Sequence, residues 1–221
     1  MAGFDSTVIT HNLPSIAHGL LITLGTWAAG VAIGLLLGFA IAVVQLFGSQ
    51  AVRGVLRAYI EVFRGTPFLI QLFLLYYGGP NFGITLEPMT AGVLGLGLYG
   101  SAYFAEVFRG GFLSVPRGHL EAAECLGLSR WQAIVRVQLP QMLLIIVPAL
   151  TNLIIILSKE TAVLSIVTVP ELTFVLTGIG SESFAFVETL LVLCVCYLAL
   201  VELTSRVGSW AEGRLSRFAI R

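Results

Sequence analysis

The sequence predicts an all-α polytopic membrane protein with five transmembrane helices, because of its composition, its low charge density and the length of its apolar runs. Of the 221 residues, 57% are hydrophobic and only 11% are charged, and the mean hydropathy is +0.95. Soluble domains carry roughly 25% charged residues, so this chain has too few to cover a globule that faces water. Several apolar runs reach the roughly 20 residues that a helix needs to cross a bilayer. A soluble enzyme and a disordered chain are therefore excluded.

The charge balance and the scarcity of metal-ligating residues exclude further classes of protein. The formal net charge is +0, from twelve basic and twelve acidic residues, which argues against a nucleic-acid partner. Three cysteines and three histidines without ligand spacing predict neither a disulfide framework nor a metal site. The chain has no GxxxxGK[ST] phosphate loop, so we expect it to bind no cofactor and to have no ATPase chemistry of its own.

The first span is predicted at residues 16–47, inside a stretch without charged residues that runs from Asp5 to Arg53. This run is too long for a signal peptide and has no positively charged front end. Residues spaced four apart share one helix face, where small side chains let a second helix approach closely. Three glycines in this span have that spacing: Gly30, Gly34 and Gly38.

The second span is predicted at residues 56–77, where Gly65-Thr66-Pro67 should break or bend the helix because proline lacks a backbone donor. The third is predicted at residues 90–108 and should stop at Gly110-Gly111, since glycine often ends a helix. The fourth and fifth spans are predicted at residues 140–157 and 185–207.

The distribution of basic residues predicts the orientation of these spans. Five crossings place eleven of the twelve basic residues on one side, in the connections after the first and third spans and in the C-terminal tail, which ends at Arg217 and Arg221. Only Lys159 lies on the other side. Because positive charge accumulates on the cytoplasmic side, the N-terminus should be periplasmic and the C-terminus cytoplasmic.

Residues 161–180 are apolar enough to form a sixth span, but Pro170-Glu171 lies at the middle of the segment. A sixth span would also move the C-terminal arginines outside and remove the charge asymmetry. We therefore expect a re-entrant or membrane-embedded segment, which is tolerated only where protein or a water-filled cavity surrounds it. Such a segment should line a pathway.

The connection at residues 109–138 is the most informative part of the chain. Ser114-Val115-Pro116 should start a helix, Gly127 should interrupt it, and a second helix should return to the membrane. The small side chains of Glu121-Ala122-Ala123 would give a short helix with little side-chain bulk, which the surface of a partner protein could bind closely. A plain amphipathic helix at the membrane interface is the alternative interpretation.

This connection resembles the signature of the membrane subunits of bacterial ABC importers: Glu-Ala-Ala, three residues, Gly, nine residues, Ile-x-Leu-Pro. The chain matches it with Glu121-Ala122-Ala123, Gly127 and Leu139-Pro140, and departs only in having Val137 in place of isoleucine. Further segments resemble the polar amino-acid uptake branch, which includes histidine and glutamine permeases. These segments are Glu61 to Pro67, Ala105 to Gly110 and Ser114 to Pro116.

The resemblance covers nearly the whole chain and implies a type I ABC importer permease fold in the bacterial inner membrane, with residues 1–221 as a single transmembrane permease domain. It implies that two permeases, identical or similar, pair with two ATPase subunits, which bind ATP-Mg. A periplasmic binding protein would deliver the amino-acid substrate, and membrane lipid would surround the spans. By match, the residues that couple the permease to the ATPase would be Glu121, Ala122, Ala123 and Gly127.

The string Glu-Val-Phe-Arg-Gly occurs twice, starting at Glu61 and at Glu106. Residues three apart share a helix face, so Glu61 should pair with Arg64, and Glu106 with Arg109. Such pairing would offset the cost of shallow burial in the membrane, and we favour this structural role. Because Glu106 lies deeper than Arg109, its alternative role is to face the transport pathway.

Lys159-Glu160 is the sharpest candidate for contact with substrate, because it contains the only lysine and precedes the embedded segment. Neighbouring residues point in different directions on a helix, so the two charges need not neutralise each other. A zwitterionic amino acid offers a carboxylate for the lysine and an ammonium for the glutamate. The alternative is an interfacial pair whose lysine extends outward to water. Thr161, Thr168 and Glu171 are weaker candidates for the same pathway.

A transport subunit is therefore the favoured function. An intramembrane enzyme would need paired carboxylates, HExxH or GxSxG within a span, and the spans contain none of these. A channel or scaffold is the third possibility. Because five spans are few for a complete pathway, we expect a dimer with an identical or a similar chain.

Overall fold

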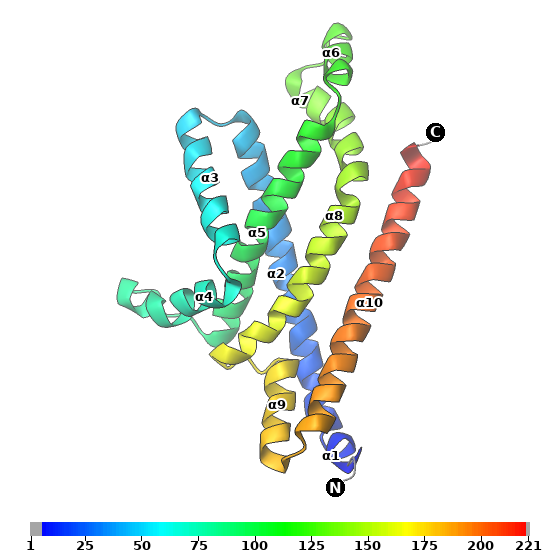
Figure 1. Ribbon diagram of the computed structural model, residues 1–221. Coiled ribbons are helices and arrows are strands. Elements are labelled where there is room, and N and C mark those ends of the chain that lie inside the picture. Colours follow the sequence, from blue (N-terminus) through cyan, green and yellow to red (C-terminus); the bar gives the residue numbers. More distant parts are fainter. Residues whose placement is uncertain (1–5, 220–221) are drawn as a thin grey trace.

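The computed structural model describes residues 6–219, with side chains as far as residue 214, and every regular element in this range is a helix (Figure 1). Asp5, Arg221 and the side chain of Arg217 lie outside the described residues. Four helices are long and apolar enough to cross a membrane, or five if one sharply bent pair counts as a span. The elements that supply them are α2 (Leu13–Phe47), α3 with α4, α5 (Pro88–Ser114), α8 (Leu139–Glu160) and α10 (Phe186–Ala219).

The second predicted span is bent, as Gly65-Thr66-Pro67 indicated. Helix α3 (Gln50–Gly65) meets the run of α4 (Phe68–Phe73), η1 (Leu74–Gly78) and η2 (Gly79–Phe82) at an angle of 109°. Thr66 is extended at the corner, with φ −120° and ψ 145°. The side-chain amide of Gln71 donates to the carbonyls of Phe63 and Thr66, at 2.8 and 3.0 Å, so it satisfies acceptors that the break exposes.

The prediction that Gly110-Gly111 ends the third helix was wrong, because α5 continues to Ser114. Gly110 is exposed, whereas Gly111 is buried against Ile146 of α8, where an added Cβ would collide with the isoleucine side chain. The glycine therefore serves close packing of two helices rather than helix termination.

The core is built on the seam between α2 and α5. A Cβ added at Gly38 would lie 2.9 Å from the backbone of Ala105 and of Ser101, so only glycine fits there. Gly30 and Gly34 make similar contacts with Leu96 and Phe104 of α5, which confirms the predicted packing face. Large side chains that are fully buried around this seam include Leu72, Leu96, Phe104, Met142 and Leu157.

Residues 161–180 form η4 (Thr161–Val167), a turn and most of α9 (Leu172–Ser183). The 12 residues of α9 extend for only about 18 Å, less than the roughly 30 Å of a bilayer core, so this segment does not cross as a single helix. Its embedding in the membrane stays a prediction. The segment lies at the same end of the molecule as α1 (Ser6–His11) and the N-terminus (Figure 1).

The opposite end of the molecule carries the predicted two-helix connection. It consists of α6 (Arg117–Cys125), α7 (Arg130–Ala133) and η3 (Ile134–Gln138), which leads directly into α8. The turn between α2 and α3 and the C-terminal end of α10 lie toward this same end (Figure 1).

Candidate coupling and transport sites

The chain reverses direction in the connection at Gly127, which has a left-handed φ of 74°. The N–H of Leu128 donates to the carbonyl of Ala123 at 3.1 Å, which closes the end of α6 in the way that a glycine at this position permits. Ser129 then caps α7, because its side chain and that of Gln132 each bond the other residue's backbone N–H. Two helices separated at Gly127 are what the sequence predicted.

The predicted coupling residues face different surroundings. Glu121 and Ala122 are exposed on α6, whereas Ala123 is 97% buried where α6 packs on α7 and η3. Two apolar side chains near the turn escaped the sequence analysis: Leu126 is 81% exposed and Trp131 is 68% exposed. Their signal is the presence of large apolar residues in an otherwise polar connection.

Side-chain hydrogen bonds tie this connection to the long helices. Nδ1 of His119 lies 2.6 Å from Oε1 of Gln141 on α8, and the Gln138 amide donates to the carbonyl of Phe112 on α5 at 2.9 Å. A displacement of α6 would therefore be passed to both α5 and α8.

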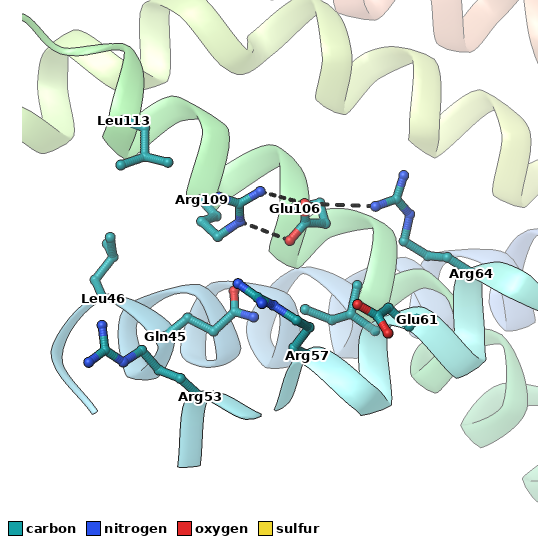
Figure 2. A pocket seen from close by; sticks show the side chains of 10 residues that line it. Gln45, Leu46, Arg53, Arg57, Glu61, Arg64, Glu106, Arg109 and Leu113 are labelled. Carbon is teal, nitrogen blue, oxygen red and sulfur yellow. Dashed lines mark hydrogen bonds and ion pairs between the residues drawn. The ribbon is translucent and has the colours of Figure 1, made fainter. Parts of the chain in front are cut away.

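Glu106 lies at the centre of an ion-pair cluster (Figure 2). Its carboxylate accepts two hydrogen bonds from Arg109, at 2.9 and 2.7 Å, which confirms the predicted pair. The other predicted pair, between Glu61 and Arg64, was wrong: Arg64 lies 3.8 Å from Glu106 instead. The packing of α3 on α5 brings the carboxylate of Glu106 within reach of Arg64. Residue spacing along one helix cannot reveal a contact between two helices.

These groups line a cavity of about 400 Å³ between α3 and the α2–α5 pair. Its charged side chains come from α3 and α5 and comprise Arg53, Arg57, Glu61, Arg64, Glu106 and Arg109. Glu106 therefore does face a cavity. Lys159, Glu160 and Thr161 do not line it.

Lys159 and Glu160 lie at the end of α8, where they have different environments. Lys159 is exposed and Glu160 is half-buried, and within the described part of the chain they form no ion pair with each other. This divergence is expected of neighbouring helical residues.

A buried polar network adjoins this pair. Glu171 has no solvent exposure and caps α9, accepting bonds of 2.8 Å from the N–H groups of Thr173 and Phe174. The hydroxyl of Tyr197 on α10 donates to Glu171 at 3.3 Å and lies 3.2 Å from the hydroxyl of Thr161. The structure thus joins the candidates Thr161 and Glu171 through Tyr197, which the sequence analysis missed.

Thr23 of α2 is the second member of this network that the sequence did not indicate. Its hydroxyl accepts a bond of 3.0 Å from the N–H of Leu172 and lies 3.5 Å from Glu171. Thr168, in contrast, is exposed in a left-handed turn with φ 62°. A threonine inside an apolar span was the only signal for Thr23, and many such threonines bond only to their own helix.

Together, the long apolar helices and the protruding α6–α7 connection define a polytopic α-helical membrane protein. The chain belongs to the family of binding-protein-dependent transport system inner membrane components, whose model matches residues 30–217. The all-α permease fold and the family resemblance expected from the sequence are thereby confirmed.

Curated relatives resemble this chain over nearly its whole length. PatM of Vibrio harveyi, described as a probable amino-acid ABC transporter permease, is 34% identical over 224 residues, covering 99% of this chain and 100% of PatM. The glutamine transport system permease GlnP of Escherichia coli K12 is 33% identical over 214 residues, covering 96% of this chain and 98% of GlnP.

Solved structures share the fold. A chain from a crystal structure described as an amino acid ABC transporter with histidines superimposes with a TM-score of 0.89 at 34% identity, covering 97% of this chain and all of that one. A chain of the inward-facing MetNI methionine ABC transporter gives a TM-score of 0.69 at 21% identity, with 97% and 99% coverage. The second likeness concerns the fold alone.

Proposed function

We propose that this chain is the permease subunit of an ABC importer that carries a polar amino acid into the bacterial cytoplasm. A separate ATPase subunit would bind and hydrolyse ATP-Mg, and a periplasmic binding protein would supply the solute. Membership of a binding-protein-dependent family and full-length similarity to proteins named as amino-acid permeases support this function. A second permease, identical or similar, would complete the pathway.

The proposed orientation puts the α6–α7 end in the cytoplasm and the N-terminus in the periplasm. Arginines lie at the start of α3, near the end of α5, on the connection and in the second half of α10, and these parts of the chain lie toward that end (Figure 1). Lys159 belongs to the part of the chain next to α9, toward the other end. Because basic residues favour the cytoplasmic side, the clustering supports this orientation.

In this proposal the ATPase binds the exposed face of α6 and the turn that follows it. Glu121 and Ala122 would enter the ATPase groove, while Ala123 and Gly127 would set the packing and the reversal that present them. Leu126 and Trp131 would add apolar contact area, since exposed apolar groups at a protein surface mark interaction sites. The bonds from His119 and Gln138 would pass motion to the spans.

The proposed substrate pathway runs past the end of α8. Lys159 and Glu160 would meet the carboxylate and the ammonium of the amino acid, and Thr161 would join them to the network around Glu171. Glu106 would contribute by holding Arg64 and Arg109 along the wall of its cavity. Charged side chains near broken helices are where transporters commonly bind solutes.

The observation that carries the coupling proposal is the exposed Glu121-Ala122 face on a connection bonded to both α5 and α8. Glu121→Lys and Gly127→Asp should each abolish ATP-driven uptake in reconstituted vesicles while the chain still inserts into the membrane. Glu212→Lys is the matched control, because Glu212 is exposed on α10 outside the connection, and it should keep uptake. Full uptake by both loop variants would refute the coupling assignment. Solute leakage through the chain alone would favour a channel instead.

A further inference from the structure

The cavity beside Glu106 contains more positive charge than its own carboxylates can neutralise. Four arginines and two glutamates line it. The carboxylate of Glu106 is bonded to Arg109 and lies 3.8 Å from Arg64, so its negative charge is already shared between these two arginines. Arg53 and Arg57 make no ion pair within 4.0 Å among the described residues. The exposed guanidinium groups of Arg53 and Arg57 therefore remain, with Arg57 beside Gln45 and Arg53 closer to Leu46 (Figure 2).

These two arginines lie one turn apart on α3, so they share one face of that helix. Both also border a second hollow of about 450 Å³, which is formed with Gln50 and Gly54. Their five N–H donors each are arranged in a planar fork that fits the oxygens of a phosphate group. The pair therefore offers hydrogen-bond donors that suit an oxyanion such as a phosphate group.

The opposite face of α3 is apolar and uncovered. Val55 is 70% exposed, and Val52 and Val62 are 43% and 59% exposed. The helix thus directs arginines toward the cavity and valines away from it, an arrangement typical of helices at a membrane interface. Exposed valines suit contact with acyl chains, which places α3 at the bilayer surface, where phospholipid headgroups are within reach of its arginines.

We infer that Arg53 and Arg57 bind the phosphate group of an anionic phospholipid, whose headgroup occupies the cavity between α3 and the α2–α5 pair. Basic pockets between transmembrane helices bind anionic headgroups, and guanidinium–phosphate hydrogen bonds are among the stronger ones in proteins. The site requires only that the chain lies in a bilayer. It uses neither the Lys159-Glu160 pair nor the coupling residues, none of which line this cavity.

The test uses the full chain, purified with the subunits that accompany it and placed in nanodiscs of phosphatidylcholine with or without phosphatidylglycerol. Native mass spectrometry counts the phosphatidylglycerol that stays bound after extraction. The double variant Arg53→Gln/Arg57→Gln should retain about tenfold less of this lipid than the wild type, since each basic group near an anionic membrane contributes appreciably to binding. Unchanged retention in this variant would overturn the proposal.

A charge-matched control separates a site from diffuse attraction. Arg206→Gln/Arg214→Gln also removes two positive charges, from α10, and should retain as much lipid as the wild type. An equal loss in this control would mean that bulk surface charge holds the lipid. If the glutamine variant fails to fold, the same measurement is made on Arg53→Lys/Arg57→Lys, which keeps the positive charge but lacks the planar guanidinium group. Lipid retention equal to that of the wild type would then refute recognition by guanidinium groups.

A second arm distinguishes lipid from soluble phosphate. Phosphatidylglycerol should raise the unfolding temperature of the wild type and leave that of Arg53→Gln/Arg57→Gln unchanged. Inorganic phosphate, added at constant ionic strength to nanodiscs of phosphatidylcholine, should raise neither. Stabilisation of the wild type alone by inorganic phosphate would overturn the lipid source, because the arginines would then be holding a soluble ion.

Discussion

The guanidinium of Arg64 lies 3.8 Å from the carboxylate of Glu106, although the two residues come from different copies of one repeated string. The carboxylate also holds Arg109, so a single glutamate connects α3 and α5. Tyr59 adds a second link between these helices, since its hydroxyl donates to the carbonyl of Leu98 at 3.0 Å. The second copy of the repeat therefore pairs within its own helix and, more loosely, with the arginine of the first copy across the fold.

The first prediction compares the two glutamates of the repeat. Glu106→Gln should lower the free energy of unfolding by about 1 kcal/mol, a modest value because both arginine partners are more than a third exposed to solvent. Glu61→Gln is the matched control and should have a smaller effect, since Glu61 forms no ion pair within the described residues. Thermal unfolding in detergent measures both, and equal losses would contradict the assignment.

The second prediction concerns the seam between α2 and α5. Gly38→Ala should destabilise the protein by about 1–3 kcal/mol, because the added methyl would meet the α5 backbone at 2.9 Å. Gly25→Ala, on the same helix with nothing within 4 Å, should leave stability unchanged or raise it slightly. Unfolding temperature and yield from the membrane report the difference. A similar result for both variants would show that the seam can open.

The third prediction tests the end of α8. Lys159→Ala and Glu160→Ala should each raise the substrate concentration for half-maximal uptake about tenfold, the effect of losing one hydrogen bond to a charged group. ATP hydrolysis should still depend on the binding protein. Glu182→Ala, which removes an exposed carboxylate in the last turn of α9, is the control and should transport normally. Unchanged uptake kinetics in both test variants would make the pair structural.

The fourth prediction addresses the buried network. Tyr197→Phe removes the hydroxyl that lies near Glu171, Thr161 and Thr173, and should cost about 1 kcal/mol of unfolding free energy. Tyr77→Phe, at an exposed position on η1, should cost less than half as much. Chemical denaturation of the two variants side by side provides the measurement. No difference between them would mean that water satisfies Glu171 as well as the tyrosine does.

Features that depend on a few neighbouring residues could be predicted from the sequence. The apolar run of α2, the bend at Pro67 and the reversal at Gly127 each follow from the length of a run or from the backbone limits of one residue. The Glu-Ala-Ala connection could be recognised as a resemblance because its spacing is local, and the coupling role of its residues stays a prediction.

Features that depend on distant contacts could not be predicted in this way. The sequence predicts a helix stop at Gly111 because glycine often ends a helix. Its actual role depends on contact with Ile146 of another helix, which no local pattern reveals. The burial of Glu171 and its bond to Tyr197 depend on how α9 lies against α10. Such contacts join residues far apart in the chain, so the pattern of neighbouring residues does not predict them.

The glycine seam also limits where this protein can change shape. At Gly38 the α5 backbone lies within 2.9 Å of an added Cβ, so α2 and α5 have little freedom to shift against each other at this point. The corner at Gly65 is different, because nothing lies within 4 Å of an added Cβ there. The corner between α3 and α4 is thus packed less tightly than the seam, and a substitution there should be tolerated where one at Gly38 is not.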